Sequence, residues 1–225
     1  MPTTYDDEFY RDILEGLAIY TGSALQRDVL RALSASQAPG IGEALNKNQI
    51  ASKMWLAQSL FDSVGGRLGQ VLILGGWVGV LGAVLLHDRR FSIDRVVSVD
   101  VDSSCAPVAQ ALNATHVETA RFVAMTRDML AIDYAREFPA STAGATDVIV
   151  NTSCEHLADF DEWFARIPPG RLLVLQSNDY FACAEHVACV PDLATFRSQA
   201  PLANILFAGE RKLSRYTRFM LIGMK

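Results

Sequence analysis

A short apolar run is followed by three glycines within five residues in the segment Gln70-Val71-Leu72-Ile73-Leu74-Gly75-Gly76-Trp77-Val78-Gly79. The apolar run predicts a strand over 70–74, buried on both faces of a sheet, and a helix-like segment follows at 79–87. Glycines at a strand-to-helix turn let the backbone approach a ligand closely, and the N-terminus of the helix favours anionic groups. We therefore expect Gly75, Gly76, Trp77 and Gly79 to line a ligand site, although a tight turn with close helix packing is the alternative for such a loop taken on its own.

Short apolar runs alternate with helical segments after this turn. We expect strands at 95–99, 121–124, 147–150 and 171–176, and helices at 106–112, 160–166 and 193–199. Continuous apolar strands separated by helices indicate a parallel sheet covered on both faces. The last two runs, 202–208 and 216–224, are joined by a turn too short for a parallel crossover, so they should pair antiparallel. The sequence thus predicts an α/β fold, a Rossmann-like doubly wound sheet with a C-terminal antiparallel strand pair.

The first 65 residues show a different pattern, because their apolar residues recur at helical spacing. We expect residues 1–65 to form an N-terminal helical cap and residues 66–225 to form the ligand-binding domain. A chain of 225 residues, 50% of them hydrophobic, can bury a sizeable core. We expect a cytoplasmic protein with reduced thiols, because its four cysteines are too few for a disulfide scaffold. The apolar stretch 71–86 is broken by glycines and falls short of the ~20 residues of a membrane span.

The charge balance bears on the partners of the protein. Its 20 Lys and Arg against 25 Asp and Glu give a net charge of −5, without a run of like charges. Binding to nucleic acid through a basic face is therefore disfavoured, because affinity for phosphates needs clustered cations. We expect a small-molecule partner, with neither nucleic acid nor membrane.

Acidic residues follow the second and third expected strands. Asp100 lies about 20 residues after the glycine turn, where an acid can accept hydrogen bonds from both ribose hydroxyls of an adenosine. Asp102 is a second candidate there, although Asp102 or Ser103 could instead cap the next helix. Asp128, followed by Met129, could accept a hydrogen bond from an adenine amino group. All these residues should lie at the carboxyl edge of the sheet, where open parallel sheets bind ligands.

At this point the chain resembles the class I S-adenosylmethionine (SAM)-dependent methyltransferase family, over residues 70–224. The glycine motif of that family, acid-x-G-x-G-x-G, maps onto residues 73–79, where Gly75 and Gly79 match. Ile73 replaces the acid and Trp77 the middle glycine. Asp100 matches the ribose-binding acid and Asp128 the adenine-contacting acid. The resemblance implies SAM as the cofactor, and the departure at Ile73 implies a SAM amine that is more easily neutral.

The ends of the fourth and fifth strands carry polar residues where the family positions its acceptor. We expect the chemistry at Asn151, Glu155, His156, Asn178 and Tyr180. Glu155 and His156 could act as a general base, or His156 could orient or cap a helix; the Glu-His pair recurs at 185–186. The cysteines and histidines of this region match no zinc-module spacing, so we expect no metal.

Amides and a lysine gather at 46–55, before and within a helix of the cap. Helical caps of the family often close over the ligand, so Gln49, Lys53 and Trp55 are candidate contacts, with Lys53 holding the SAM carboxylate. A solvated helix end is the alternative interpretation of this segment.

Methyl transfer from SAM to a small-molecule acceptor is the first function that the resemblance implies. No N-P-P-Y/F/W motif follows the fourth strand, which disfavours amide substrates. A second function is suggested by a similarity to azetidine-2-carboxylate synthases, in which SAM is the substrate, its amine attacks its own γ-carbon and methylthioadenosine leaves. A related transfer of the aminobutyryl arm, as in nicotianamine-type synthases, and a non-catalytic SAM-binding regulator are further alternatives. NAD is disfavoured because Trp77 occupies the second glycine position of its fingerprint.

Overall fold

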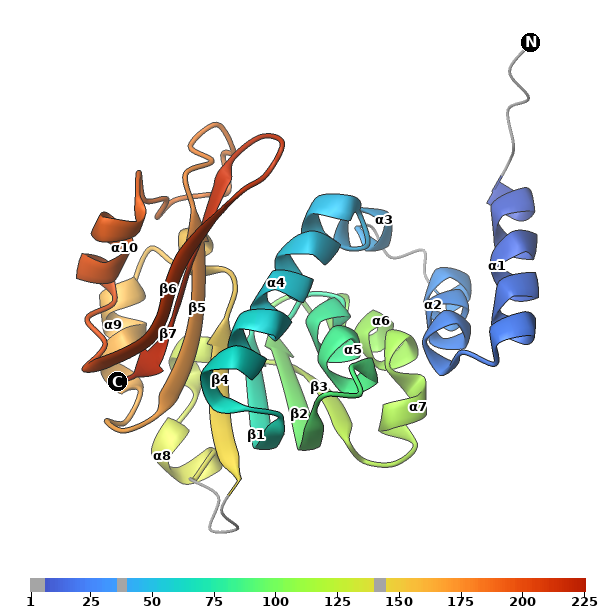
Figure 1. The fold of residues 1–225 in the computed structure, drawn as a ribbon, viewed down its shortest axis with the longest axis horizontal. Coiled ribbons are helices and arrows are strands. Elements are labelled where there is room, and N and C mark those ends of the chain that lie inside the picture. The colour runs from blue at the N-terminus through green and yellow to red at the C-terminus, as the bar shows by residue number, and fades with distance from the viewer. Residues whose placement is uncertain (1–6, 36–39, 140–144) are drawn as a thin grey trace.

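The structure is a computed structural model that describes residues 7–35, 40–139 and 145–225. Its strands are β1 (Arg67–Leu74), β2 (Ser92–Asp100), β3 (Phe122–Thr126), β4 (Thr146–Asn151), β5 (Leu172–Asn178), β6 (Asn204–Lys212) and β7 (Thr217–Met224). They form one sheet in the order β3-β2-β1-β4-β5-β7-β6 (Figure 1). Strands β1 to β5 are parallel, and β7 is antiparallel to β5 and β6. The predicted α/β class and the antiparallel closing pair are confirmed.

Helices cover both faces of the sheet. They are α5 (Val80–His87), α6 (Cys105–Leu112), α7 (Ala114–Val117), α8 (Tyr134–Glu137), α9 (Phe160–Arg166) and α10 (Leu193–Gln199), with single 3₁₀ turns η1 (Met129–Ala131) and η2 (Cys154–His156). Successive residues of β1 alternate between the layers. Val71 and Ile73 join the apolar cluster that contains α5, whereas Leu72 and Leu74 join the one that contains α9 and α10. Burial on both faces explains why these strands are continuously apolar.

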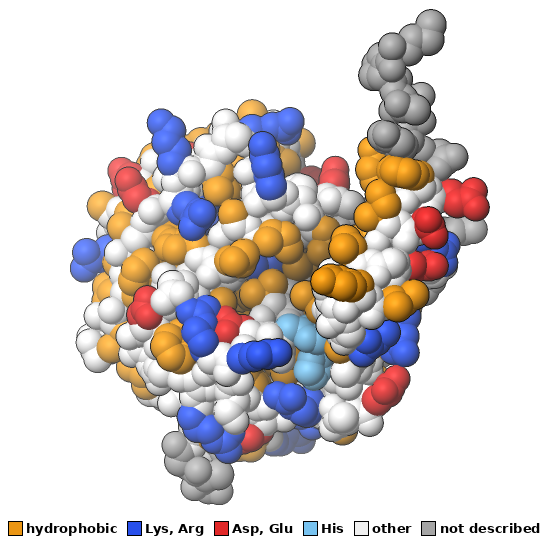
Figure 2. Space-filling model, turned by 45° about the vertical axis from the view of Figure 1, so that its right-hand side comes forward, with side chains coloured by type: hydrophobic (Ala, Val, Ile, Leu, Met, Phe, Trp, Pro, Cys, Tyr) orange, Lys and Arg blue, Asp and Glu red, His pale blue; other side chains and the backbone are white. Residues whose placement is uncertain are grey.

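The N-terminal segment is helical, with α1 (Asp7–Thr21), α2 (Ala24–Ala35), α3 (Ile41–Ala44) and α4 (Lys47–Val64). Residues 1–6 and 36–39 of the expected cap lie outside the described residues. Helix α4 packs on the sheet, because Leu56 and Leu60 are fully buried in the same cluster as Val71. Helix α1 packs against α2 and stands away from the sheet (Figure 1), and Figure 2 shows hydrophobic side chains gathered on it. The division at residue 65 into two domains stays a prediction.

Several element bounds differ from those expected. Strand β6 continues to Lys212 instead of ending at residue 208, because its pairing with β7 extends to the register Lys212↔Thr217. Strand β2 begins at Ser92, paired with Arg67 at the start of β1. The short elements α3, α7, α8, η1 and η2 were not predicted, since one turn of helix carries no periodicity. Within the described ranges no helix is both long and apolar enough to span a bilayer.

Candidate functional site

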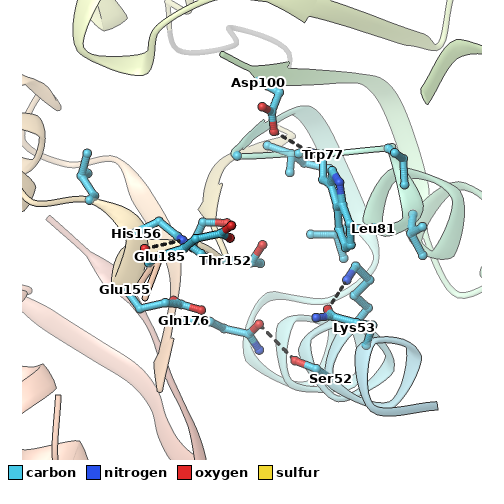
Figure 3. Close-up of a pocket in the computed structure, with 18 of the residues that line it drawn as sticks. Ser52, Lys53, Trp77, Leu81, Asp100, Thr152, Glu155, His156, Gln176 and Glu185 are labelled. Carbon is cyan, nitrogen blue, oxygen red and sulfur yellow. Dashed lines mark hydrogen bonds between the residues drawn. The ribbon is translucent and has the colours of Figure 1, made fainter. Parts of the chain in front are cut away.

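A cavity of about 860 Å³ lies at the carboxyl ends of the parallel strands. Its wall comprises the turn after β1, the loops after β2 to β5, the beginning of β7 and one side of α4 (Figure 3). From β1 the chain passes to β2 and β3 on one side and then to β4 and β5 on the other. The cavity therefore lies at the switch point of the sheet, where folds of this type bind ligands, and its volume suits a small organic ligand.

The glycine turn has a left-handed backbone at Gly75 (φ 60°), Trp77 (φ 48°) and Gly79 (φ 79°). Trp77 keeps this conformation at a steric cost that a glycine does not have. Gly76 is required by close approach, because a Cβ atom there would lie 2.0 Å from Ser98 Oγ. Gly75, Gly76 and Trp77 line the cavity, and Figure 3 shows the Trp77 side chain there. Gly79 is not among the lining residues and packs against α6.

Asp100 lies at the end of β2 and lines the cavity. Its Oδ2 accepts a hydrogen bond from the Trp77 backbone N–H at 2.8 Å, and its Oδ1 accepts one from the Asp102 backbone N–H at 3.0 Å. Asp102 is exposed and lies outside the lining. The Ser104 backbone N–H donates to Asp102 at 2.8 Å, and this bond lowers the pKa of Asp102. The structure thus directs Asp100 to the cavity and Asp102 to the start of α6.

Asp128 and Met129 follow β3 and also line the cavity. Asp128 is exposed and caps η1, accepting a hydrogen bond from the Leu130 backbone N–H at 2.9 Å. Met129 Sδ lies 3.7 Å from the amide nitrogen of Asn151. Asn151 is fully buried and is not among the lining residues; its Oδ1 accepts from the Ser153 backbone N–H at 2.9 Å. Its side chain therefore supports the loops beside the cavity from behind.

Opposite Asp100, an ion pair is buried in the wall of the cavity. Glu155 is 2% exposed and Arg218, from β7, is 6% exposed, with Glu155 Oε1 and Arg218 Nη2 3.5 Å apart. The amide of Asn178 donates to the same Glu155 Oε1 at 2.5 Å, and Asn178 itself is fully buried outside the lining. Burial alone would lower the pKa of Arg218, but the Glu155 carboxylate raises it. Asn178 and Arg218 thus hold one oxygen of Glu155, and the other, Oε2, has no hydrogen-bond partner.

Aromatic and imidazole rings form the neighbouring part of the wall. His156 Nδ1 donates to the Glu185 carbonyl oxygen at 3.0 Å (Figure 3). The His156 and His186 rings meet edge to face with centroids 4.5 Å apart, and burial lowers the pKa of His186. Tyr180 stacks on Tyr216, with centroids 5.6 Å apart. These rings line the cavity together with Glu155, so the structure brings Glu155, His156 and Tyr180 to the same part of the wall.

Helix α4 supplies the cap side of the cavity. Asn46 caps the helix, accepting from the backbone N–H groups of Asn48 and Gln49. Lys53 Nζ donates to Gln49 Oε1 at 2.9 Å, and both side chains line the cavity. Burial, and secondly the charge of Arg218, lower the pKa of Lys53 to about 7. Trp55 is not a lining residue; it packs against Phe207, with ring centroids 6.1 Å apart.

Sequence reasoning missed several lining residues, among them Arg218, Tyr216, Gln176 and Ser52. The Ser52 hydroxyl donates to Gln176 Oε1 at 3.3 Å and joins α4 to β5 (Figure 3). One signal was available for Arg218, a charged residue beside the apolar run 219–222. A lone cation at the start of a buried strand needs a buried partner.

No protein-family model matches the sequence, and no curated protein matches it. Solved methyltransferase structures share its fold. The N-methyltransferase NodS from Bradyrhizobium japonicum WM9, in complex with S-adenosyl-L-homocysteine, has a TM-score of 0.56 at 15% identity, covering 89% of this chain and 96% of NodS. Geranyl diphosphate C-methyltransferase from Streptomyces coelicolor A3(2) has a TM-score of 0.54 at 12% identity, with coverages of 78% and 79%. The chain therefore has the class I methyltransferase fold.

Proposed function

We propose that this protein is a SAM-dependent enzyme that transfers a methyl group from SAM to a small-molecule acceptor. The observation that carries the proposal is the position of Asp100 beside the glycine turn, at the switch point of a methyltransferase fold. The net charge of −5 supports a small-molecule acceptor over a nucleic acid.

The residues present fit the adenosine part of SAM. A carboxylate offers about four lone-pair sites, and backbone N–H groups use two of those on Asp100. The remaining ones would accept the ribose hydroxyls. Asp128, exposed at the cavity, would accept from the adenine amino group. Gly75 and Gly76 present only backbone to the cavity, which leaves room for the ligand beside the turn.

Lys53 would bind the SAM carboxylate. Its pKa of about 7 reflects a site that disfavours an unpaired ammonium, and a carboxylate would supply the missing counter-charge. Gln49 accepts one hydrogen of the Lys53 ammonium and would keep its position fixed.

SAM would supply an electrophilic methyl group on its sulfonium. Glu155 and His156 would bind and orient the reacting group of the acceptor, since both line the cavity on the side opposite Asp100. Tyr180, stacked on Tyr216, presents an aromatic surface, which attracts cations by about 0.5–2 kcal/mol. Asn178 positions Glu155 from behind the wall.

Cyclisation of SAM as the substrate is a second candidate function, and Ile73 is the observation that favours it. Ile73 lines the cavity at the position where the methyltransferase family has an acid. An apolar surrounding lowers the pKa of an amine, so a neutral, nucleophilic SAM amine is more accessible here than beside a carboxylate.

Incubation of the pure protein with SAM alone, followed by mass spectrometry, distinguishes these functions. Bound SAM that stays intact, and becomes S-adenosylhomocysteine only when an acceptor is added, is the result expected for methyl transfer. Methylthioadenosine with azetidine-2-carboxylate, formed without any acceptor, would instead establish cyclisation. Absence of SAM binding in calorimetry would contradict both.

A further inference from the structure

Three side chains that can bind a metal ion meet in the wall of the cavity. Glu155 and His156 belong to η2, directly after β4, and His186 lies in the loop after β5. One potential ligand atom of each lies within 4.8 Å of those of the other two. All three line the cavity. The cysteine and histidine spacings gave no indication of this group, because the loops meet only through the pairing of β4 with β5.

Only one of the two oxygens of the Glu155 carboxylate has interaction partners. Oε1 receives the Asn178 amide and lies near Arg218, whereas Oε2 is buried without a hydrogen-bond partner. A buried carboxylate oxygen without a partner is costly and uncommon in native proteins. Because Arg218 lies on the Oε1 side, Oε2 is the oxygen left to bind a cation.

A hydrogen bond and a ring contact fix the positions of the two histidines. His156 Nδ1 carries the hydrogen that the Glu185 carbonyl oxygen accepts at 3.0 Å, which leaves Nε2 as the ring nitrogen that can bind a metal ion. In a metal-binding histidine, the ring nitrogen that does not bind the metal usually donates a hydrogen bond to a carboxylate, a backbone carbonyl or water. The His186 ring meets that of His156 edge to face with centroids 4.5 Å apart, and His186 Nδ1 lies 3.7 Å from Cys189 Sγ.

We propose that Glu155, His156 and His186 bind one divalent ion of a first-row transition metal. Two imidazole nitrogens and one carboxylate favour ions such as Zn²⁺, Fe²⁺ or Co²⁺ over Mg²⁺ and Ca²⁺, which prefer oxygen ligands. Ligand atoms bound at about 2.1 Å in tetrahedral geometry lie roughly 3.4 Å apart. Since His156 is exposed, a small shift of its side chain that keeps the hydrogen bond to the Glu185 carbonyl can shorten the present separations of up to 4.8 Å. Three protein ligands leave a further position of the ion open.

If the protein transfers a methyl group as proposed, the coordination position of the ion that no protein ligand fills indicates the chemical class of the acceptor. An ion in the wall of the cavity would bind an acceptor through an oxygen or nitrogen lone pair. A bound ion also lowers the pKa of a coordinated hydroxyl. Acceptors with a hydroxyl or carboxylate group near the methylated atom are therefore favoured over apolar ones.

Titration of the untagged, metal-free protein with Co²⁺ tests the site, with visible absorption as the readout and Zn²⁺ as competitor. We expect one ion per chain. His186→Ala and Glu155→Gln should each weaken Co²⁺ binding at least about 100-fold, since loss of an outer-shell partner alone costs 10–100-fold. Circular dichroism of each variant verifies that it is folded, and His186→Ala is the safer variant because Glu155 also pairs with Arg218.

Two control variants separate this site from the rest of the chain. Glu185→Gln makes the same charge change in the neighbouring loop and keeps the carbonyl that accepts from His156. His87→Gln removes a ring of the other histidine pair, His87 and His116, whose centroids lie 4.7 Å apart. Both controls should bind Co²⁺ like the wild type.

Absence of Co²⁺ binding by the wild type, undiminished binding by His186→Ala, or loss of binding by His87→Gln would each overturn the proposal. SAM is not present in the titration and is measured separately by calorimetry. Co²⁺ binding without SAM binding would contradict the proposed function and leave the metal site standing. SAM binding without Co²⁺ binding would contradict the metal site and leave the proposed function standing.

Discussion

The two sides of the cavity are built from different interactions. On the β1–β3 side, the Asp100 carboxylate is held by backbone N–H groups and remains partly exposed, and Asp128 is exposed. On the β4–β7 side, Glu155 and Arg218 are charges buried in the protein, connected through side chains from different strands. Removal of a partly exposed acid affects mainly the ligand, whereas removal of a buried one leaves its partner unpaired. Substitutions on the first side should therefore change mainly ligand binding, whereas substitutions on the second side should change ligand binding and stability together.

Glu155→Ala should have the largest effect. It leaves the Arg218 guanidinium, 6% exposed, without its ion-pair partner, and we expect the free energy of unfolding to fall by about 3–5 kcal/mol. Urea denaturation measures this change. Glu185→Ala, an exposed acid in the next loop, is the control and should stay within about 0.5 kcal/mol of the wild type. An equal loss in both variants would contradict the comparison between buried and exposed acids.

Asp100→Ala should weaken SAM binding and lower the free energy of unfolding by only about 1–3 kcal/mol, less than Glu155→Ala does, because it removes two backbone hydrogen bonds but leaves no buried charge unpaired. Loss of charge-assisted bonds to the ribose is worth roughly 1.5–3 kcal/mol, or about 10- to 150-fold in Kd. Calorimetry measures the affinity, and urea denaturation the stability. Asp102→Ala decides between the two acids of the sequence prediction: Asp102 lies outside the lining, so its removal should leave the SAM affinity unchanged. A larger effect at Asp102 than at Asp100 would show that the ribose acid is misassigned.

Gly76→Ala should destabilise the turn by about 1–3 kcal/mol. The added Cβ would lie 2.0 Å from Ser98 Oγ and 3.2 Å from Ser98 Cβ. The double variant Gly76→Ala/Ser98→Ala removes the closer contact and should recover part of the loss in thermal or urea unfolding. Additive losses in the double variant would mean that Ser98 is not what excludes a side chain at this position.

Lys53 should give the smallest effect, a dependence of SAM affinity on pH. The pKa of Lys53 is lowered to about 7 by burial and secondly by Arg218. Below this value the free protein already carries the ammonium that would bind the SAM carboxylate. Above it, binding must take up a proton, so affinity should fall by up to about tenfold from about pH 7 to about pH 8.

Calorimetry on the wild type and on Lys53→Met measures this difference, because titration of SAM itself is common to both proteins and cancels. The variant should bind SAM more weakly at low pH and lack the additional slope. Parallel pH profiles in the two proteins would exclude Lys53 as the carboxylate ligand.

The first side of the cavity could be predicted from the sequence to a large extent. The apolar run before Gly75, and the acids Asp100 and Asp128 after later runs, are local signals: a buried strand is continuously apolar, and its carboxyl end is where the chain turns. Gly79 shows the limit of that reasoning, because a motif position can serve the packing of α6 and not the cavity. Trp77 shows another limit, since only the backbone angles of the structure show that a tryptophan adopts the left-handed conformation at this position.

The second side could be predicted only as a collection of polar residues. Asn151 and Asn178 were expected to act on the ligand, but both are buried outside the lining, and Asn178 holds Glu155 from behind. The catalytic roles of Glu155, His156 and Tyr180 stay predictions. The partners that define this side, Arg218 and His186, come from segments far along the chain, and the pairing of β5 with β4 and β7 brings them there.

The sequence alone determined the strands, the glycine turn, the antiparallel closing pair and the acids at the strand ends, because hydrophobic periodicity and turn chemistry act over a few residues. Only the tertiary structure decided which side chains share the cavity, which ones support it from behind, and that Glu155, His156 and His186 meet. These contacts depend on the lateral order of the strands, which is fixed by packing of the whole sheet.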